Sequence, residues 1–173
     1  MKSALFSFVV IVSALVLTPS ATAAEKKSGN TIDKKFQYVQ INRFDVQSGV
    51  DFPPDYQLTI VEDLNKELAK IKDVKQVLRE GEAMPQELPV LLVTGTITKY
   101  KKGNQAERYL VGFGAGATVI NAHIKYYDAT TKELLLEQDV DGKVVMGLMG
   151  GKSEGANNGL AKEIAKDVKK TFF

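Results

Sequence analysis

The feature that most constrains the fold is a run of residues near the middle of the chain. Leu88 to Lys99 reads LPVLLVTGTITK, and Val90 to Val93 is apolar at every position. A strand has this pattern when both of its faces are covered. The run then alternates through Thr94, Thr96 and Thr98, and branched threonine side chains suit a pleated surface. The sequence therefore predicts a central strand with further structure around it.

The other elements follow from periodicity. Four further segments predict strands, namely 35–45, 74–79, 117–127 and 133–145. Asp128 can cap its own turn, so the last two strands form a hairpin. Apolar stripes predict a helix from about 55 to 72 and a second one at the C-terminus, capped by Ser153 or Asn158. This order predicts an α+β fold with a mixed, largely antiparallel sheet and two amphipathic helices packed on one face.

The N-terminal segment predicts export. Lys2 precedes an uncharged, mainly apolar run of about 14 residues, whereas a helix needs roughly 20 to span a bilayer. Small residues follow at 21–23, which completes the layout of a secretory signal peptide. We expect cleavage after Ala23, a flexible tether over residues 24–34 and a single α+β domain over residues 35–173. The mature protein would then be periplasmic or secreted.

Composition excludes several classes of function. Lys and Arg number 23 and Asp and Glu number 21. This balance lacks the basic excess that nucleic-acid binding requires, so no nucleic-acid partner is expected. The chain has no cysteine, which rules out disulfides, thiolate catalysis and lipid attachment at a cysteine. No cofactor and no metal site are expected, and the fold must depend on its apolar core.

Glycines are concentrated in the second half of the chain. Nine of the 14 lie between residues 112 and 159. Glycine weakens regular structure by roughly 0.5–1 kcal/mol relative to alanine, so the clusters imply close backbone approach or positive φ. Arg108 precedes the first cluster and could pair with a ligand anion or with a carboxylate of the sheet. The candidate binding residues are Arg108, Gly112, Gly114, Gly116, Gly150 and Gly151.

The same segments carry a resemblance. Residues 108–116 (RYLVGFGAG), 127–130 (YDAT) and 150–151 (GG), ahead of the C-terminal helix, resemble the bacterial family called domain of unknown function 4410. The resemblance covers roughly residues 88–172. It implies an exported envelope protein with no assigned activity, and it supplies no catalytic residue. This chain lacks the lipid-attachment cysteine of several members, and it has Thr131 and Lys132 where a glycine is common.

Three local patterns resemble chemical sites without meeting their requirements. Residues 147–153 (GLMGGKS) are one residue short of a phosphate-binding loop, so we interpret them as a turn into the last helix. His123 lies on a polar strand face, which is typical of a surface histidine, and one histidine cannot build the usual catalytic zinc site. Asp139 and Asp141 lack the spacing of a calcium loop and indicate an alternating strand.

We therefore predict an exported, non-catalytic module that binds another envelope protein or itself, or that helps to assemble an envelope structure. One alternative is a peripheral outer-membrane component that associates through its glycine-rich segments, because residues 109–124 and 144–151 carry no Asp, Glu, Lys or Arg. Another is a hydrolase of an envelope polymer that uses two carboxylates. No motif in the sequence places such a pair.

Overall fold

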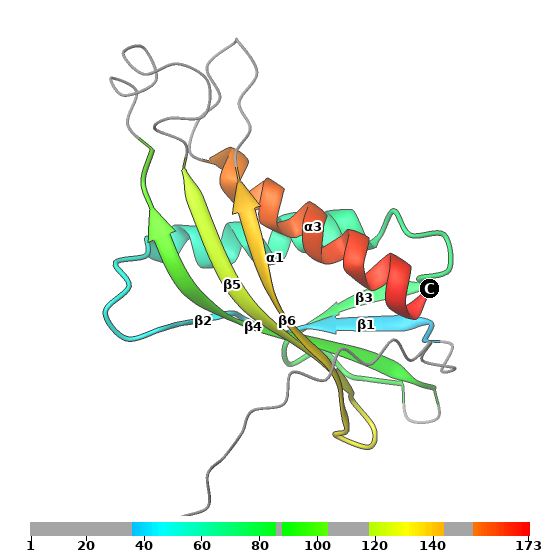
Figure 1. Cartoon of the computed structure of the whole chain (residues 1–173). Helices are drawn as coiled ribbons and strands as arrows, with labels where there is room; N and C mark the ends of the chain where they lie inside the picture. The colour runs from blue at the N-terminus through cyan, green and yellow to red at the C-terminus, as the bar shows by residue number, and fades with distance from the viewer. Residues whose placement is uncertain (1–35, 86–87, 104–117, 144–153) are drawn as a thin grey trace, which may run out of the picture. The chain divides into compact units, whose positions relative to one another are not determined.

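The computed structural model describes residues 36–85, 88–103, 118–143 and 154–173, all within the compact unit Thr31–Phe173. The predicted signal peptide and tether lie outside the described residues. The elements, labelled in Figure 1, are β1 (Tyr38–Ile41), β2 (Asp45–Val46), α1 (Pro54–Leu68), β3 (Gln76–Arg79), β4 (Val90–Lys101), β5 (Val119–Asp128), β6 (Leu134–Lys143) and α3 (Glu154–Phe172).

One mixed sheet organises the fold, with the strand order β3-β1-β4-β5-β6 and β2 beside β4. The two long pairings, β4 with β5 and β5 with β6, are antiparallel. The short strands β1 and β2 pair with β4 in parallel, and β3 pairs with β1 in parallel. These pairings confirm the expected α+β class and place the segment around Val90 to Val93 in the middle of the sheet.

Both helices pack on the same face of the sheet, as expected, and they lie side by side (Figure 1). Alternate residues of β5 point toward them, and Ile120, Ala122, Ile124 and Tyr126 are fully buried. The core continues into α1 and α3 through Ile60, Leu64, Leu68, Leu160, Ile164 and Val168. No helix in the described ranges is long and apolar enough to span a membrane.

The predicted strand 35–45 is two strands, because the chain bulges between them. Tyr38 lies opposite Val90, whereas Asp45 lies opposite Thr96, so the first chain segment carries one extra residue over that interval. The Arg43 N–H leaves the ladder and donates to Glu80 Oε2 at 3.1 Å. Such a bulge bends a strand and ends its regular pairing. The prediction of one continuous strand was therefore wrong.

The helix ends also differ from the sequence predictions. The first helix ends at Leu68 rather than near residue 72, because the following amides form tighter turns, such as the Ile71 N–H donating to Leu68 O at 3.0 Å. Asn158 lies inside α3 and is not its cap, so that alternative was wrong. The other predicted cap, Ser153, lies outside the described residues.

Close backbone approach, which was predicted for the glycine clusters that lie outside the described residues, occurs at Gly142 of β6. A Cβ at this position would lie 2.6 Å from Leu160 Cβ and 3.0 Å from both Leu160 Cα and N. Real side chains avoid such distances, so only a bare backbone lets α3 approach β6 this closely. Gly142 thus sets the spacing between the last strand and the last helix.

Candidate functional site

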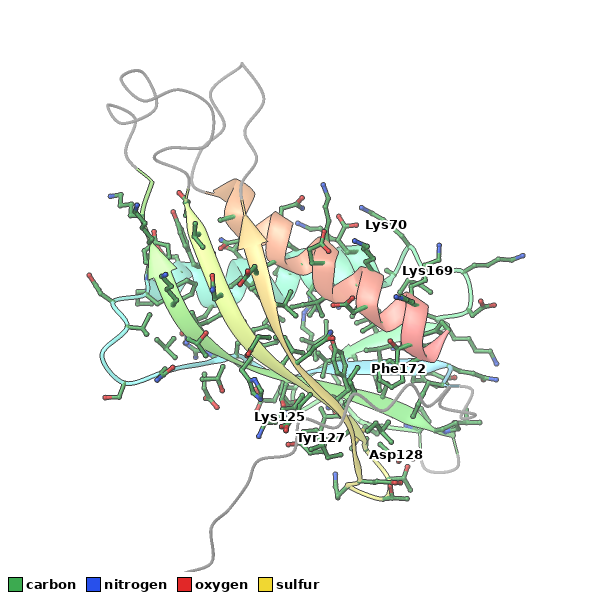
Figure 2. All side chains as sticks on the ribbon, in the orientation of Figure 1. Lys70, Lys125, Tyr127, Asp128, Lys169 and Phe172 are labelled. Carbon is green, nitrogen blue, oxygen red and sulfur yellow. The ribbon has the colours of Figure 1, made fainter. Side chains whose placement is uncertain are left out.

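The face of the sheet turned away from the helices is the largest candidate surface. Lys125 and Tyr127 lie on this side, whereas Lys70 and Lys169 lie on the helix side (Figure 2). We call this surface the open face. In the three long strands it includes Leu92, Thr94, Thr96, Asn121, His123, Lys125, Tyr127, Glu137, Asp139 and Asp141. All of these residues are half-buried or exposed.

A charged cluster lies on the open face where β5 pairs with β6. His123 Nδ1 lies 2.8 Å from Asp139 Oδ1, and its Nε2 lies 3.5 Å from Glu137 Oε2. Lys125 Nζ lies 3.8 Å from Glu137 Oε2. The Asp139 side chain is 82% exposed, and solvated pairs of this kind contribute only about 0–1 kcal/mol each. The cluster is a solvated surface network, in agreement with the interpretation of His123 as a surface histidine.

The cluster does not have the geometry of a metal site. The two carboxylates lie against different nitrogens of the same ring, whereas a mononuclear site takes one nitrogen from each histidine. No group of three or more His, Asp or Glu side chains within the described ranges is arranged to hold a metal ion.

A groove of about 680 Å³ runs beside the end of β4. It is lined by the loop between β2 and α1, by Tyr56 of α1 and by β4 residues that include Lys99 and Tyr100. The Tyr100 ring packs edge-on against Phe52 at 5.2 Å and Tyr56 at 6.1 Å between ring centroids. Burial is the main cause that raises the pKa of Tyr100, followed by the nearby Tyr56. The groove therefore has a packed aromatic floor.

A bulge places lysines along the edge of this groove. Ile97 pairs with Ala122 and Lys99 pairs with Asn121, so Thr98 is an extra residue in β4. In a strand with regular alternation, Lys99 would share the face of Ile97 and point toward the core. The bulge instead puts Lys99 and Lys101 on the open face and turns Tyr100 inward. Lys102 follows directly, and all three lysines are exposed.

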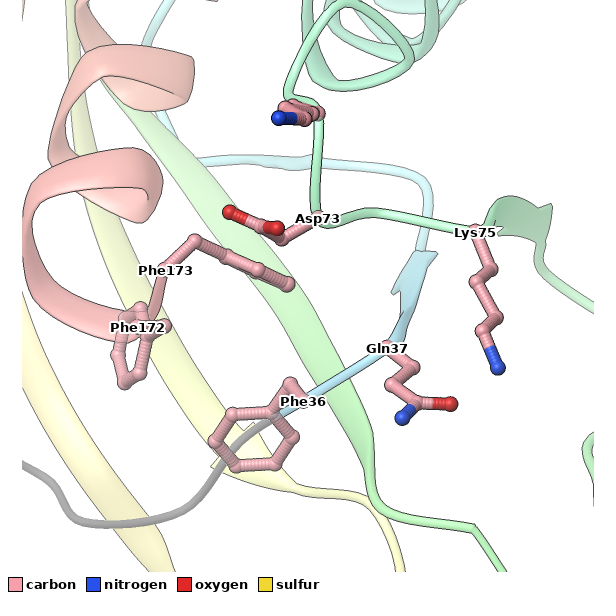
Figure 3. Close-up of a pocket in the computed structure, with 7 residues that line it drawn as sticks. Phe36, Gln37, Asp73, Lys75, Phe172 and Phe173 are labelled. Carbon is pink, nitrogen blue, oxygen red and sulfur yellow. The ribbon is translucent and has the colours of Figure 1, made fainter.

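A second groove, of about 540 Å³, lies at the C-terminal end of α3. Figure 3 shows Phe36, Phe172 and Phe173 gathered on one side of it and Lys75 on the other. The Phe36 and Phe172 rings meet edge-on at 5.9 Å between centroids. Lys72 and Asp73 complete a charged rim. The groove pairs an aromatic wall with charges of both signs.

The binding residues predicted from the sequence all lie outside the described residues, so the structure does not place them. They are Arg108, Gly112, Gly114, Gly116, Gly150 and Gly151. Sequence reasoning missed the three lysines at and directly after the end of β4. The signal was present as KYKK at residues 99–102. The side of β4 on which these lysines lie depends on the Thr98 bulge, and local periodicity does not predict that bulge.

Comparison with known families gives one match. The family described as "Domain of unknown function (DUF4410)" matches residues 47–148, which is more than half of the chain. No curated protein matches the sequence.

Solved structures of several bacterial proteins have a similar fold. A dodecamer of a singly substituted PelC from Paraburkholderia phytofirmans has a TM-score of 0.55 and 10% identity, covering 79% of this chain and 88% of that one. A second PelC dodecamer from the same organism has a TM-score of 0.54 and 10% identity, covering 75% and 86%. Protein XCC0632 from Xanthomonas campestris, of family DUF330, has a TM-score of 0.52 and 6% identity, covering 79% and 83%. At these identities the similarity shows the fold alone.

Proposed function

This chain belongs to the domain of unknown function 4410 family, and from that premise we propose that it is an exported, non-catalytic module that self-associates in the cell envelope. Its copies bind one another and form an assembly through their sheets. The export part rests on the leader-like pattern of residues 1–23. The assembly part rests on the sheet.

The observation that carries the proposal is the position of β6. This strand spans Leu134–Lys143, ten residues, and lies at the end of the strand order, paired with β5 on one side. No strand in the described part of the chain pairs with its other side. A long edge strand presents free backbone N–H and C=O groups, which pair readily with a second chain. Self-association gives these groups partners.

The fold similarity adds support of a different kind. PelC, whose structures are dodecamers, shares this fold over most of its length. The same sheet and helices are therefore compatible with an assembly of many copies. A non-catalytic role is further supported by the solvated state of the His123 cluster, because a general base works best in a site that excludes water.

Cross-linking in intact cells tests the proposal. The full chain is expressed with its own leader in a Gram-negative host, treated with an amine-reactive cross-linker and separated by cell fraction. We expect a ladder of multiples of one chain in the periplasmic or secreted fraction, with an N-terminus at Ala24. A single band at the mass of one chain, or an unprocessed chain in the cytosol, would overturn the proposal.

A carbonate wash of the membrane fraction separates this proposal from the membrane alternative. The proposed module is released into the wash, because it is held only by protein contacts. Retention in the washed membranes would instead favour association through the glycine-rich segments.

A further inference from the structure

We propose, on the basis of the self-association above, that copies of this chain join head to tail through two oppositely charged edges of the three-stranded segment β4-β5-β6. The first is the basic edge, consisting of Lys99, Lys101 and Lys102 at the end of β4. The second is the acidic edge, consisting of Glu137, Asp139 and Asp141 on β6. The acidic edge of one copy binds the basic edge of the next.

The two edges lie on opposite sides of one segment. In Figure 1 β5 lies between β4 and β6, in agreement with the strand order. On the side of β4 away from β5, pairing with β2 stops at Ile97, where the Gln47 N–H donates to Ile97 O at 3.0 Å. Beyond Ile97, no other described strand pairs with this side of β4. Within the described residues, β6 along its length and β4 beyond Ile97 therefore have an unpaired side.

The lysines of the basic edge are not neutralised by ion pairs within the described part of the chain. Lys99, Lys101 and Lys102 are exposed, and none of them forms an ion pair within the ranges that the structure describes. Asp51 is an acidic residue that lines the adjoining groove. Three lysines over four positions repel one another, and an acidic partner would relieve that repulsion.

The acidic edge has a matching pattern. Asp139 and Asp141 are exposed and point to the open face at a two-residue spacing, as Lys99 and Lys101 do. The two strands run in the same direction, because each is antiparallel to β5. When Asp139 of one copy lies against Lys99 of the next, Asp141 therefore lies against Lys101. The charges complement each other pair by pair.

Charge also decides between two symmetries. A two-fold contact between two β6 edges would place acidic residues against acidic residues, which is unfavourable. A head-to-tail contact places acidic against basic residues and can repeat, which generates a ring when the rotation closes. The sequence therefore favours an assembly of more than two copies.

The groove beside β4 provides space for the incoming strand. It has a volume of about 680 Å³ and is lined by Lys99 and Lys102 on one side and by the loop after β2 on the other. Its Tyr56 and Tyr100 walls can cover apolar atoms of the neighbouring strand, while the lysines meet the carboxylates. The partner is thus a second copy of this chain.

Charge reversal with complementation tests the inference. One variant carries K99E and K101E, and the other carries D139K and D141K. A control, K72E with K75E, makes the same charge change as the first variant on the connector before β3. Sedimentation velocity is run on each full chain as purified from the host. We expect the Kd between copies to rise about a hundredfold in each edge variant alone, because two attractions become repulsions.

Mixing gives the decisive result. The first variant has two acidic edges and the second has two basic edges, so a 1:1 mixture should reassemble, and the control should stay assembled. Because D139K removes a partner of His123, D141K alone is run as a second acidic-edge variant. An assembled wild type whose edge variants also stay assembled would overturn the inference and leave the proposed self-association standing. Dissociation of the β6 variants only would also overturn it, in favour of a two-fold contact. A wild type that is monomeric would overturn the proposed function itself.

Discussion

Replacing Gly142 by alanine should loosen the contact between β6 and α3. The new Cβ would lie 2.6 Å from Leu160 Cβ and 3.0 Å from Leu160 Cα and N. Two of these three atoms belong to backbone, so the conflict is relieved only by moving the helix. Overpacking of this kind costs about 2–3 kcal/mol. The alanine also restricts the unfolded chain and recovers about 0.5–1 kcal/mol, which leaves a net loss of about 1–2.5 kcal/mol.

Urea and thermal unfolding measure this loss at a fixed protein concentration. For a chain of this size, the loss corresponds to a fall in Tm of about 2–10 °C. The control is Lys162→Ala, which introduces the same residue on the exposed side of α3 and should change stability by less than about 0.5 kcal/mol. A Gly142→Ala protein as stable as the wild type would refute the claim that bare backbone sets the helix–strand spacing.

Three further changes test the hairpin turn and the contact between α3 and β6. Asp128→Ala should cost about 1–3 kcal/mol in urea unfolding, because Asp128 Oδ1 accepts the Thr130 N–H at 2.8 Å and the Thr131 N–H at 3.1 Å; unchanged stability would contradict this role. Lys132 has a φ of 61°, so Lys132→Gly should stabilise the protein by about 0.5–1 kcal/mol, and a loss of stability would show that the strain is absent. Burial raises the pKa of Asp167 from its ordinary 3.8, and the hydrogen bond that Gln138 donates at 2.7 Å only partly opposes this. The folded state therefore binds the proton more tightly, so the contribution of Asp167 is full below the unfolded pKa and is lost as pH rises through the raised folded pKa. Asp167→Asn should match the wild type near about pH 3 and exceed it in Tm near about pH 7, and a constant difference across pH would contradict the assignment.

Much of the fold could be predicted from local pattern. The apolar run at Val90 to Val93 indicated a central strand, and this strand lies in the middle of the sheet. The expectation that both of its faces are covered is not met within the described residues, where the helices pack on one face and Leu92 is half-buried on the open face. The alternation of β5 and β6 predicted which residues face the core, and it placed His123 on the opposite, polar face, where the side chain is half-buried. These predictions succeed because burial follows directly from side-chain periodicity.

The departures come from contacts between distant parts of the chain. The break between β1 and β2 is held by side chains far away, since Gln57 donates to Phe44 O at 3.1 Å and Glu80 accepts the Arg43 N–H. The bulge at Thr98 likewise reverses the alternation of β4, so the lysines after it face a different side from the one that the pattern indicates. Local periodicity does not encode an extra residue in one of two paired strands.

The candidate site also has one part that the sequence pattern indicates and one part that depends on contacts between distant residues. The glycine clusters were selected because they are unusual in composition, and they lie outside the described residues, so their role stays a prediction. The basic edge is instead a property of topology. Lys99 and Lys101 gain their significance from an unpaired strand side and from acidic residues two strands away. Neither relation is visible before the strand order is known.

The mass of the native protein tests the central claim most directly. Native mass spectrometry of the wild-type chain, purified with its exported N-terminus, counts how many copies associate. The account predicts a single closed species of more than two copies, which weakens as salt screens the paired charges. A monomer at every concentration, or a dimer that does not respond to salt, would contradict it.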